Sequence, residues 1–148
     1  MDSVILELKR LALPVRYPLK WNRTFLRLWI LLLKMKLFQL KNLLQFTIKW
    51  DLVKEEVEYT SGVKVNNMPL KLPVEFISDD YPSAKVYTIR HNGPYDHMGN
   101  AWSTLYGMAQ NKELIENKSI SPVEVYQNSP RMVGPKELIT DVHFPVKE

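Results

Sequence analysis

The sequence predicts an α+β fold in which a strand–helix–strand–strand unit occurs twice and the strands form an antiparallel sheet. Each half of the 148-residue chain contains one segment whose apolar residues recur at three- and four-residue intervals, as in an amphipathic helix. Short segments with β-branched or aromatic residues at alternate positions flank these helices. A shift of 77 residues superimposes the two halves and places Phe25 on Trp102 and Trp29 on Tyr106.

The first unit is expected to begin with a strand from Val4 to about Leu11. A helix should run from near Leu19 to about Leu44, because apolar side chains fall along one face and basic side chains occupy the others. Two strands follow, at Phe46–Asp51 and Val57–Val65, each with β-branched or aromatic residues at alternate positions.

The second unit repeats this order. A strand at Ala84–His91 leads into a turn, where Gly93 supplies a permissive backbone and Pro94 suits a first helical position. The helix that follows carries an apolar face and fades near Asn117. The last three elements are expected to be a strand, a loop and a closing strand, at residues 122–128, 130–135 and 137–146.

The length suits one domain made of two repeats, since domains commonly contain about 100–200 residues. We expect repeat one at residues 1–65, a proline-containing linker at 66–82 with a short strand around 74–77, and repeat two at 83–148. One unit cannot cover both faces of its sheet, so the two should pair about a pseudo-twofold axis. A ligand cleft is expected at their junction.

The charge is unevenly distributed along the chain. The formal net charge is +4 and the isoelectric point about 9.2, which suggests nucleic-acid binding. However, residues 1–50 carry ten basic and two acidic side chains, whereas residues 51–148 carry ten basic and fourteen acidic ones. The basic excess therefore belongs to the predicted first helix. The region Arg16–Lys49 lacks a turn between two short helices and is rich in Trp and Leu, so no direct nucleic-acid binding is expected.

Several chemistries and locations are excluded by composition. The chain contains no cysteine, which rules out disulfides, thiolate zinc sites and cysteine nucleophiles. The three histidines, His91, His97 and His143, have no metal-ligand spacing, so no metal or cofactor is expected. The apolar stretch Phe25–Leu33 is interrupted by Arg27 and is far shorter than the roughly 20 residues of a membrane span. A cytoplasmic protein without a membrane span is expected, although a basic helix of this kind can also lie on an anionic membrane surface.

The segment Pro122–Pro130, PVEVYQNSP, carries the most chemical information. Side chains alternate between faces along a strand, so Val123 and Val125 should point one way and Glu124 and Tyr126 the other. We expect the valines to pack beneath a helix. Strand alternation alone leaves two interpretations of the Glu124 face: a solvated surface, or a ligand-binding face with a carboxylate and a phenol.

Three segments resemble the GyrI-like family, also called the AraC-type effector-binding domain. They are AKVYTIRHNGPYDHMGNAW (84–102), PVEVYQNSP (122–130) and ELITDVHFPV (137–146). The first 65 residues fit only by element order, with Arg16-Tyr17-Pro18 in place of a Gly-Pro-Tyr turn. The resemblance implies a duplicated fold that captures hydrophobic, often cationic, small molecules. It also implies that Glu124 is the carboxylate that faces the cation.

Aromatic side chains are expected to complete the site, because aromatic faces attract cations. Tyr126 shares the predicted face of Glu124 and is the first choice. The other candidates, each of which could equally pack in the core or at the surface, are Tyr87, Trp50, Tyr59 and Trp102. Trp29 and Tyr106 are expected to belong to the helix-to-sheet core. The 77-residue shift places Thr47 on Glu124, so one cationic ligand per chain is expected.

The resemblance leaves alternatives open. Family members that bind DNA gyrase suggest a protein-interaction inhibitor. In relatives the domain follows a helix-turn-helix or stands alone, so a separate transcription regulator is an alternative partner for this chain. Some relatives are hydrolases, in which case Glu124 would serve as a general base assisted by Tyr126 or water. No catalytic residue is assigned, and the chain is expected to be a monomer or a homodimer.

Overall fold

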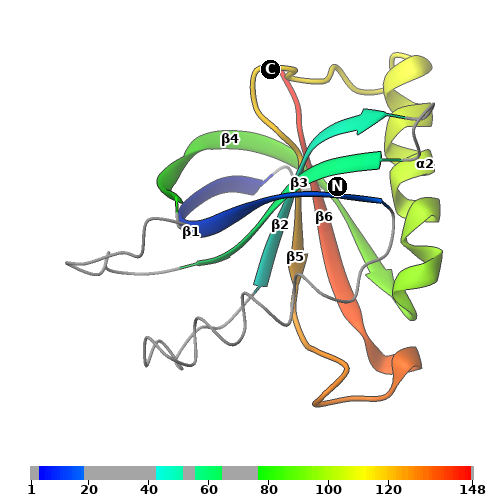
Figure 1. Cartoon of the computed structure of the whole chain (residues 1–148). Helices are drawn as coiled ribbons and strands as arrows, with labels where there is room; N and C mark the ends of the chain where they lie inside the picture. The colour runs from blue at the N-terminus through cyan, green and yellow to red at the C-terminus, as the bar shows by residue number, and fades with distance from the viewer. Residues whose placement is uncertain (1–3, 19–42, 52–55, 65–76, 148) are drawn as a thin grey trace. The chain divides into compact units, whose positions relative to one another are not determined.

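A computed structural model of the chain describes residues 4–18, 43–51, 56–64 and 77–147. Side chains are described at Thr60 and from Asp80 to Lys147. The chain divides into two units, one formed by Met1–Glu7 with Pro82–Glu148 and the other by Leu8–Tyr81. Each unit carries antiparallel strands, and the fold class is α+β. The elements are labelled in Figure 1.

The unit Leu8–Tyr81 contains three antiparallel strands in the order β1–β3–β2. They are β1 (Val4–Pro18), β2 (Leu43–Asp51) and β3 (Glu56–Lys64), and β3 pairs with both others. The two expected strands after residue 45 are confirmed. The first strand continues beyond Leu11 to Pro18, since Leu13, Val15 and Tyr17 extend its alternating pattern.

The predicted first helix falls mostly on residues 19–42, which lie outside the described residues. Its expected last residues, Leu43 and Leu44, belong to β2, where they pair with Val63 and Gly62.

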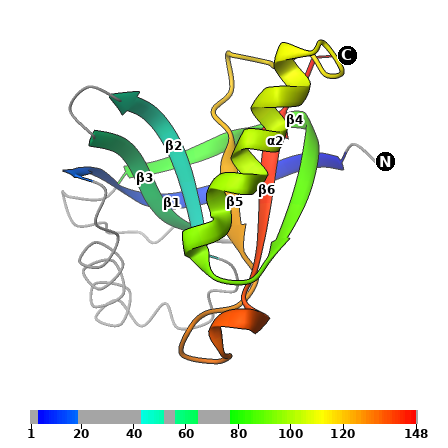
Figure 2. The same ribbon diagram turned by 90° about the vertical axis from the view of Figure 1, so that its right-hand side faces the viewer.

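The unit Pro82–Glu148 repeats the same strand order. Its strands are β4 (Ile77–Asn92), β5 (Val123–Tyr126) and β6 (Ile139–Pro145), and β6 pairs antiparallel with both β4 and β5. The 3₁₀ turn η1 (Tyr95–His97) leads into the helix α2 (Met98–Gln110), and a second 3₁₀ turn, η2 (Pro135–Glu137), precedes β6. Figure 2 shows α2 beside β5 and β6.

Two boundaries in this unit differ from expectation. β4 begins at Ile77, so residues 77–82 are strand rather than linker. α2 ends at Gln110 rather than near Asn117, because Lys112 adopts a left-handed conformation with φ of 60°. The amide of Lys112 donates to the carbonyl of Ala109 and that of Glu113 to the carbonyl of Met108. This pair of hydrogen bonds is the Schellman motif that terminates helices.

The turn before α2 matches its prediction at Gly93 but differs at Pro94, which precedes the first helical residue, Tyr95, instead of occupying that position. Gly93 has a φ of +128°, which L-residues with a side chain rarely adopt, and its amide donates to the carbonyl of Leu138 over 2.8 Å. Pro94 then caps η1 in an extended conformation.

A second connection closes the loop between β5 and β6. The side chain of Asn128 donates to the carbonyl of Glu137 at 2.8 Å and accepts from the amide of Ile139 at 2.9 Å. One amide side chain thus joins the two ends of the loop, whose residue Met132 is 77% exposed.

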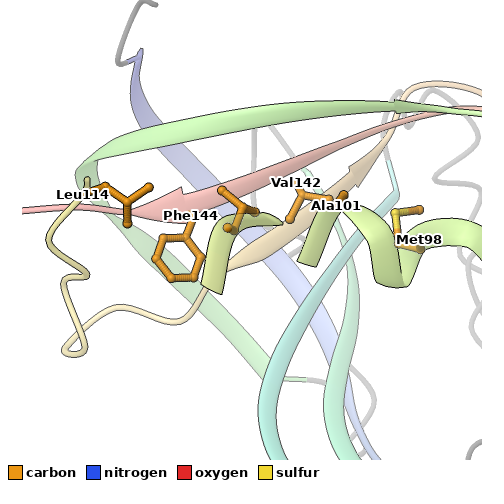
Figure 3. Packing of buried hydrophobic residues seen from close by; sticks show 6 residues of the cluster. Met98, Ala101, Leu114, Val142 and Phe144 are labelled. Atoms are coloured by element: carbon orange, nitrogen blue, oxygen red, sulfur yellow. The ribbon is translucent and has the colours of Figure 1, made fainter. Parts of the chain in front are cut away.

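The hydrophobic core of this unit lies between α2 and the sheet (Figure 3). Leu105, Val142 and Phe144 are fully buried, and Tyr87, Ile89 and Trp102 pack around them. The remaining buried members are Met98, Ala101 and Leu114. Within the described residues, no helix is both long and apolar enough to cross a membrane.

The prediction that the valines of β5 pack beneath the helix is wrong. Directly paired residues of antiparallel strands share one face, and Glu124 pairs with Val142, a member of the core beneath α2. Glu124 and Tyr126 therefore lie on the helix side, whereas Val123 and Val125 lie on the other. All four residues of β5 are buried. Because both faces of the strand are buried, the hydrophobicity pattern does not indicate which face the helix covers.

Candidate functional site

A buried carboxylate lies on the helix-facing side of the β4–β6–β5 sheet, in strand β5. Glu124 is only 3% exposed. One of its oxygens accepts a hydrogen bond from the indole Nε1 of Trp102 at 2.6 Å, and the other accepts one from the hydroxyl of Tyr126 at 2.5 Å. Both donors are neutral aromatic side chains, so the negative charge is solvated by the protein without being neutralised.

The strand pairing explains why these groups meet. One row across the three strands contains Ile89, Val142 and Glu124, and the row beside it contains His91, Thr140 and Tyr126. Glu124 and Tyr126 are two residues apart on β5, so they point to the same side. Trp102, one turn into α2, reaches down to Glu124 from the helix.

Tyr95 adds an aromatic wall that the sequence interpretation did not include. Its ring meets the ring of Tyr126 edge-on, with centroids 5.3 Å apart and planes at 86°. The Gly93-Pro94-Tyr95 turn positions this ring, because it directs the chain from β4 into η1. The signal was present in the sequence as the third residue of that turn.

Trp102 also begins an aromatic row along α2. Its ring stacks on that of Tyr106 at 5.9 Å, and Tyr106 meets Phe144 edge-on at 5.4 Å. Tyr106 was expected in the core, but it is 39% exposed and covers the core from outside. The row therefore joins the carboxylate site to the hydrophobic core.

Burial dominates the electrostatics of Glu124. Desolvation raises the pKa of its carboxyl above the ordinary value, and the hydrogen bonds from Tyr126 and Trp102, with the nearby His91, only partly oppose this. The pKa of Tyr95 is raised as well, first by burial and then by the charge of Glu124. Such a carboxylate would gain from a positively charged ligand that restores the solvation it lost on burial.

The raised pKa of Glu124 predicts a pH-dependent stability. A raised acid pKa favours folding at acidic pH, and this contribution is lost as the pH rises through the folded-state value. Glu124→Gln removes the titration and keeps the shape, with the amide accepting from Trp102 and donating to Tyr126. We expect the free energy of unfolding of the variant minus that of the natural chain to be larger at about pH 8 than at about pH 4. Urea unfolding at the two pH values measures this difference.

Glu113→Gln serves as the control for this prediction, because Glu113 is exposed. Its stability difference from the natural chain should not depend on pH in the same way. A constant difference between Glu124→Gln and the natural chain across that range would contradict the raised pKa.

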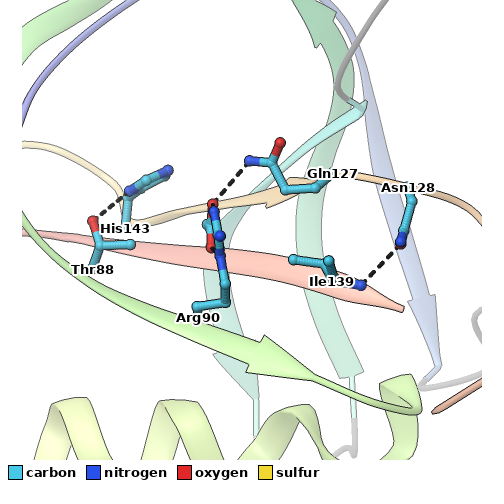
Figure 4. A network of polar contacts seen from close by, with 7 residues as sticks. Thr88, Arg90, Gln127, Asn128, Ile139 and His143 are labelled. Carbon is cyan, nitrogen blue, oxygen red and sulfur yellow. Dashed lines mark hydrogen bonds and ion pairs between the residues drawn. The ribbon is translucent and has the colours of Figure 1, made fainter. Parts of the chain in front are cut away.

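The opposite face of the sheet carries a separate polar network (Figure 4). Arg90 donates two hydrogen bonds to Asp141, at 2.7 and 2.8 Å, and Gln127 donates a third at 2.9 Å. Burial alone would raise the pKa of Asp141, but the contacts with Arg90 and Gln127 outweigh it and lower that pKa. This carboxylate is already paired with Arg90, so the two side chains form a structural ion pair.

The hydroxyl of Thr88 lies 2.7 Å from Nδ1 of His143 on this same face. Burial lowers the pKa of His143 despite the nearby Asp141. His91 lies on the helix side, with Nε2 3.0 Å from the carbonyl of Pro94. Among the described residues, no three His, Asp or Glu side chains gather as a metal site.

The structure brings some of the predicted site residues together. Trp102 and Tyr126 contact Glu124, whereas Tyr87 packs against the core cluster two rows from His91. Trp50 and Tyr59 lie in β2 and β3, paired with Val57 and Thr47, and their side chains lie outside the described residues.

The fold and the Glu124 site define an α+β domain in which a helix covers a buried carboxylate on an antiparallel sheet. The chain matches the family of the GyrI-like small molecule binding domain over residues 18–147, and it belongs to that family. This confirms the resemblance found in the sequence. The match also extends through most of the first half, where only the order of elements was similar.

Solved structures agree on the fold. The C-terminal domain of EcmrR is 17% identical, with a TM-score of 0.72 and coverage of 99% of this chain and 98% of that one. The protein SAV2435 bound to tetraphenylphosphonium is 14% identical, with a TM-score of 0.67 and coverage of 99% and 94%.

A hydrolase encoded by lin2189 from Listeria innocua is 12% identical, with a TM-score of 0.68 and coverage of 99% and 91%. At these identities the likenesses show a shared fold. No curated protein matches the sequence significantly.

Proposed function

We propose that the chain is a binding module for hydrophobic, cationic small molecules, with Glu124 as the counter-charge. The observation that carries this proposal is the solvation of Glu124: a buried carboxylate accepts hydrogen bonds from two aromatic side chains and has no Lys or Arg ion pair among the described residues. A lipophilic cation supplies the missing positive charge. The rings of Tyr126, Tyr95 and Trp102 supply flat apolar surface and attraction to the cation, roughly 0.5–2 kcal/mol each.

This chemistry favours a wide range of ligands. Attraction to one buried charge and van der Waals contact with aromatic rings impose few directional constraints, so ligands of different shapes can share the site. SAV2435, a protein with the same fold, has been solved with tetraphenylphosphonium, a lipophilic cation. That complex makes tetraphenylphosphonium a suitable first probe for this chain.

Comparing a cation with a neutral molecule of similar bulk tests the role of Glu124. The natural chain and Glu124→Gln would be titrated calorimetrically with tetraphenylphosphonium and with triphenylphosphine oxide. Loss of the charge should weaken binding of the cation about tenfold, which corresponds to about 1.4 kcal/mol of binding free energy. It should change the affinity for the neutral molecule little. Glu113→Gln, at an exposed carboxylate, should bind both probes like the natural chain. Equal affinity of the natural chain and Glu124→Gln for the cation would refute the counter-charge role.

The strand order of the two units supports a duplicated architecture for this module. Both units carry three antiparallel strands in which the third lies between the first and second. The 77-residue shift carries β1 onto 81–95 and β2 onto 120–128, which overlap β4 and β5. We take residues 1–148 as one effector-binding domain composed of these two repeats.

Hydrolysis is the second candidate activity. A buried carboxylate with a raised pKa beside a phenol has the chemistry of a general base, and Glu124 lies 2.5 Å from the hydroxyl of Tyr126. Incubation with an aryl ester, followed by release of the phenol, tests this activity. Turnover in the natural chain that disappears in Glu124→Gln would support it.

Two assays test the predicted protein partners. A supercoiling assay tests inhibition of DNA gyrase, and copurification tests binding to a separate transcription regulator.

A further inference from the structure

A second polar group lies buried on the same face as Glu124 and has no hydrogen-bond partner among the described residues. Thr140 is 0% exposed, and its Oγ1 makes no hydrogen bond within the part of the chain that the structure describes. A buried hydroxyl that makes no hydrogen bond costs free energy, so such groups are rare in folded proteins. The hydroxyl of Thr140 therefore calls for an explanation.

The position of Thr140 relates it directly to the carboxylate site. Thr140 pairs with Tyr126 on one side and with His91 on the other, so all three point toward α2 and η1. Glu124 is its diagonal neighbour on β5, because Glu124 pairs with Val142, two residues along β6. Diagonal neighbours in an antiparallel pair lie about 7–8 Å apart at Cα, so one small polar group can contact both side chains.

We propose that Thr140 is a specificity residue whose Oγ1 accepts a hydrogen bond from the cation that Glu124 binds, and that the preferred ligand is a lipophilic primary or secondary ammonium or an amidinium. The inference rests on the proposed function and narrows its ligand class. Such a cation carries at least two N–H groups. One donates to Glu124 and another to Thr140, while the apolar part of the ligand contacts Tyr95 and Trp102.

The chemistry of the alternatives explains the preference. A quaternary ammonium or phosphonium ion has no N–H, so it would compensate the charge of Glu124 but leave Thr140 without a partner. An N–H cation satisfies both buried groups at once. Sites with buried polar groups discriminate against analogues that cannot pair with them, because those groups then stay unsatisfied.

A matched pair of ligands tests the proposal. The natural chain, Thr140→Val and Thr140→Ser would be titrated with 1-naphthylmethylammonium and its N,N,N-trimethyl analogue at neutral pH. Valine keeps the β-branched shape and removes the hydroxyl, whereas serine keeps the hydroxyl. The natural chain should prefer the primary ammonium about tenfold. Thr140→Val should lose that preference through weaker binding of the primary ammonium alone, and Thr140→Ser should retain it.

The ligand-free proteins give a second measurement. Thr140→Val removes a buried hydroxyl that has no partner among the residues the structure describes, so its thermal unfolding midpoint should equal or exceed that of the natural chain. A lower midpoint would show that Thr140 has a partner in the free protein and would overturn the inference.

The binding outcomes separate this inference from the proposed function. If the natural chain binds both naphthyl cations equally, or if Thr140→Val weakens both to the same degree, the specificity role fails while cation binding stands. If Glu124→Gln binds both cations as tightly as the natural chain does, the proposed function fails and the inference fails with it.

Discussion

Replacing Phe144 by alanine is expected to lower the free energy of unfolding by about 3–5 kcal/mol, the largest effect of any single substitution considered. Phe144 is fully buried in the core cluster of the second unit, between the sheet and α2. Its ring also supports Tyr106, which meets it edge-on at 5.4 Å. Truncation removes the buried area and leaves a cavity that α2 cannot fill without shifting. Urea unfolding monitored by circular dichroism measures the loss.

Ile115→Ala is the matched control for this prediction. Ile115 is also a large hydrophobic residue, but 60% of it is exposed, so its truncation should cost well under 1 kcal/mol. A loss below about 1 kcal/mol for Phe144→Ala would mean that the cluster between α2 and the sheet does not hold this unit together.

Tyr126→Phe is expected to cost about 2–3 kcal/mol at neutral pH, because it removes a hydrogen bond to a buried carboxylate. The ring and its contact with Tyr95 remain, but one oxygen of Glu124 loses the hydroxyl donor 2.5 Å away. The cost should shrink at acidic pH, where Glu124 is protonated and needs less solvation. Urea unfolding at two pH values measures both effects.

Tyr106→Phe provides the comparison for this change. Its hydroxyl forms no hydrogen bond within the described residues, and the stack of its ring on Trp102 is unchanged by the substitution. It should alter stability by less than about 0.5 kcal/mol at either pH. If Tyr126→Phe behaves like Tyr106→Phe, the hydroxyl of Tyr126 does not stabilise the carboxylate.

Local features could be predicted well from the sequence, but the side of the sheet on which the helix packs could not. Period-two alternation correctly placed Glu124 and Tyr126 together, since that property depends on the strand alone. The side on which α2 packs depends on the tertiary arrangement. Because Val123 and Val125 are also buried, hydrophobicity indicated the wrong side. The end of α2 was misplaced for a different reason, since Lys112 adopts a left-handed conformation in which glycine is the usual signal.

The parts of the site missed by sequence interpretation depend on pairing between distant segments. Tyr95 reaches Tyr126 only because the Gly93 turn folds η1 over β5. Thr140 becomes a neighbour of Glu124 only through the register of β5 against β6. Neither relation leaves a periodic pattern in the sequence. Only the position of Tyr95 in the Gly93-Pro94-Tyr95 turn is visible there, whereas its contact with Tyr126 and the place of Thr140 beside Glu124 depend on the fold.

The double hydrogen bond of Asn128 has a consequence for engineering. Because this side chain joins both ends of the segment between β5 and β6, the loop that contains Met132 is closed at its base. Exposed loop tips are favourable places for inserted sequence. A fluorescent reporter inserted there would leave the strands of the site continuous, so the protein could be labelled without interrupting β5 or β6.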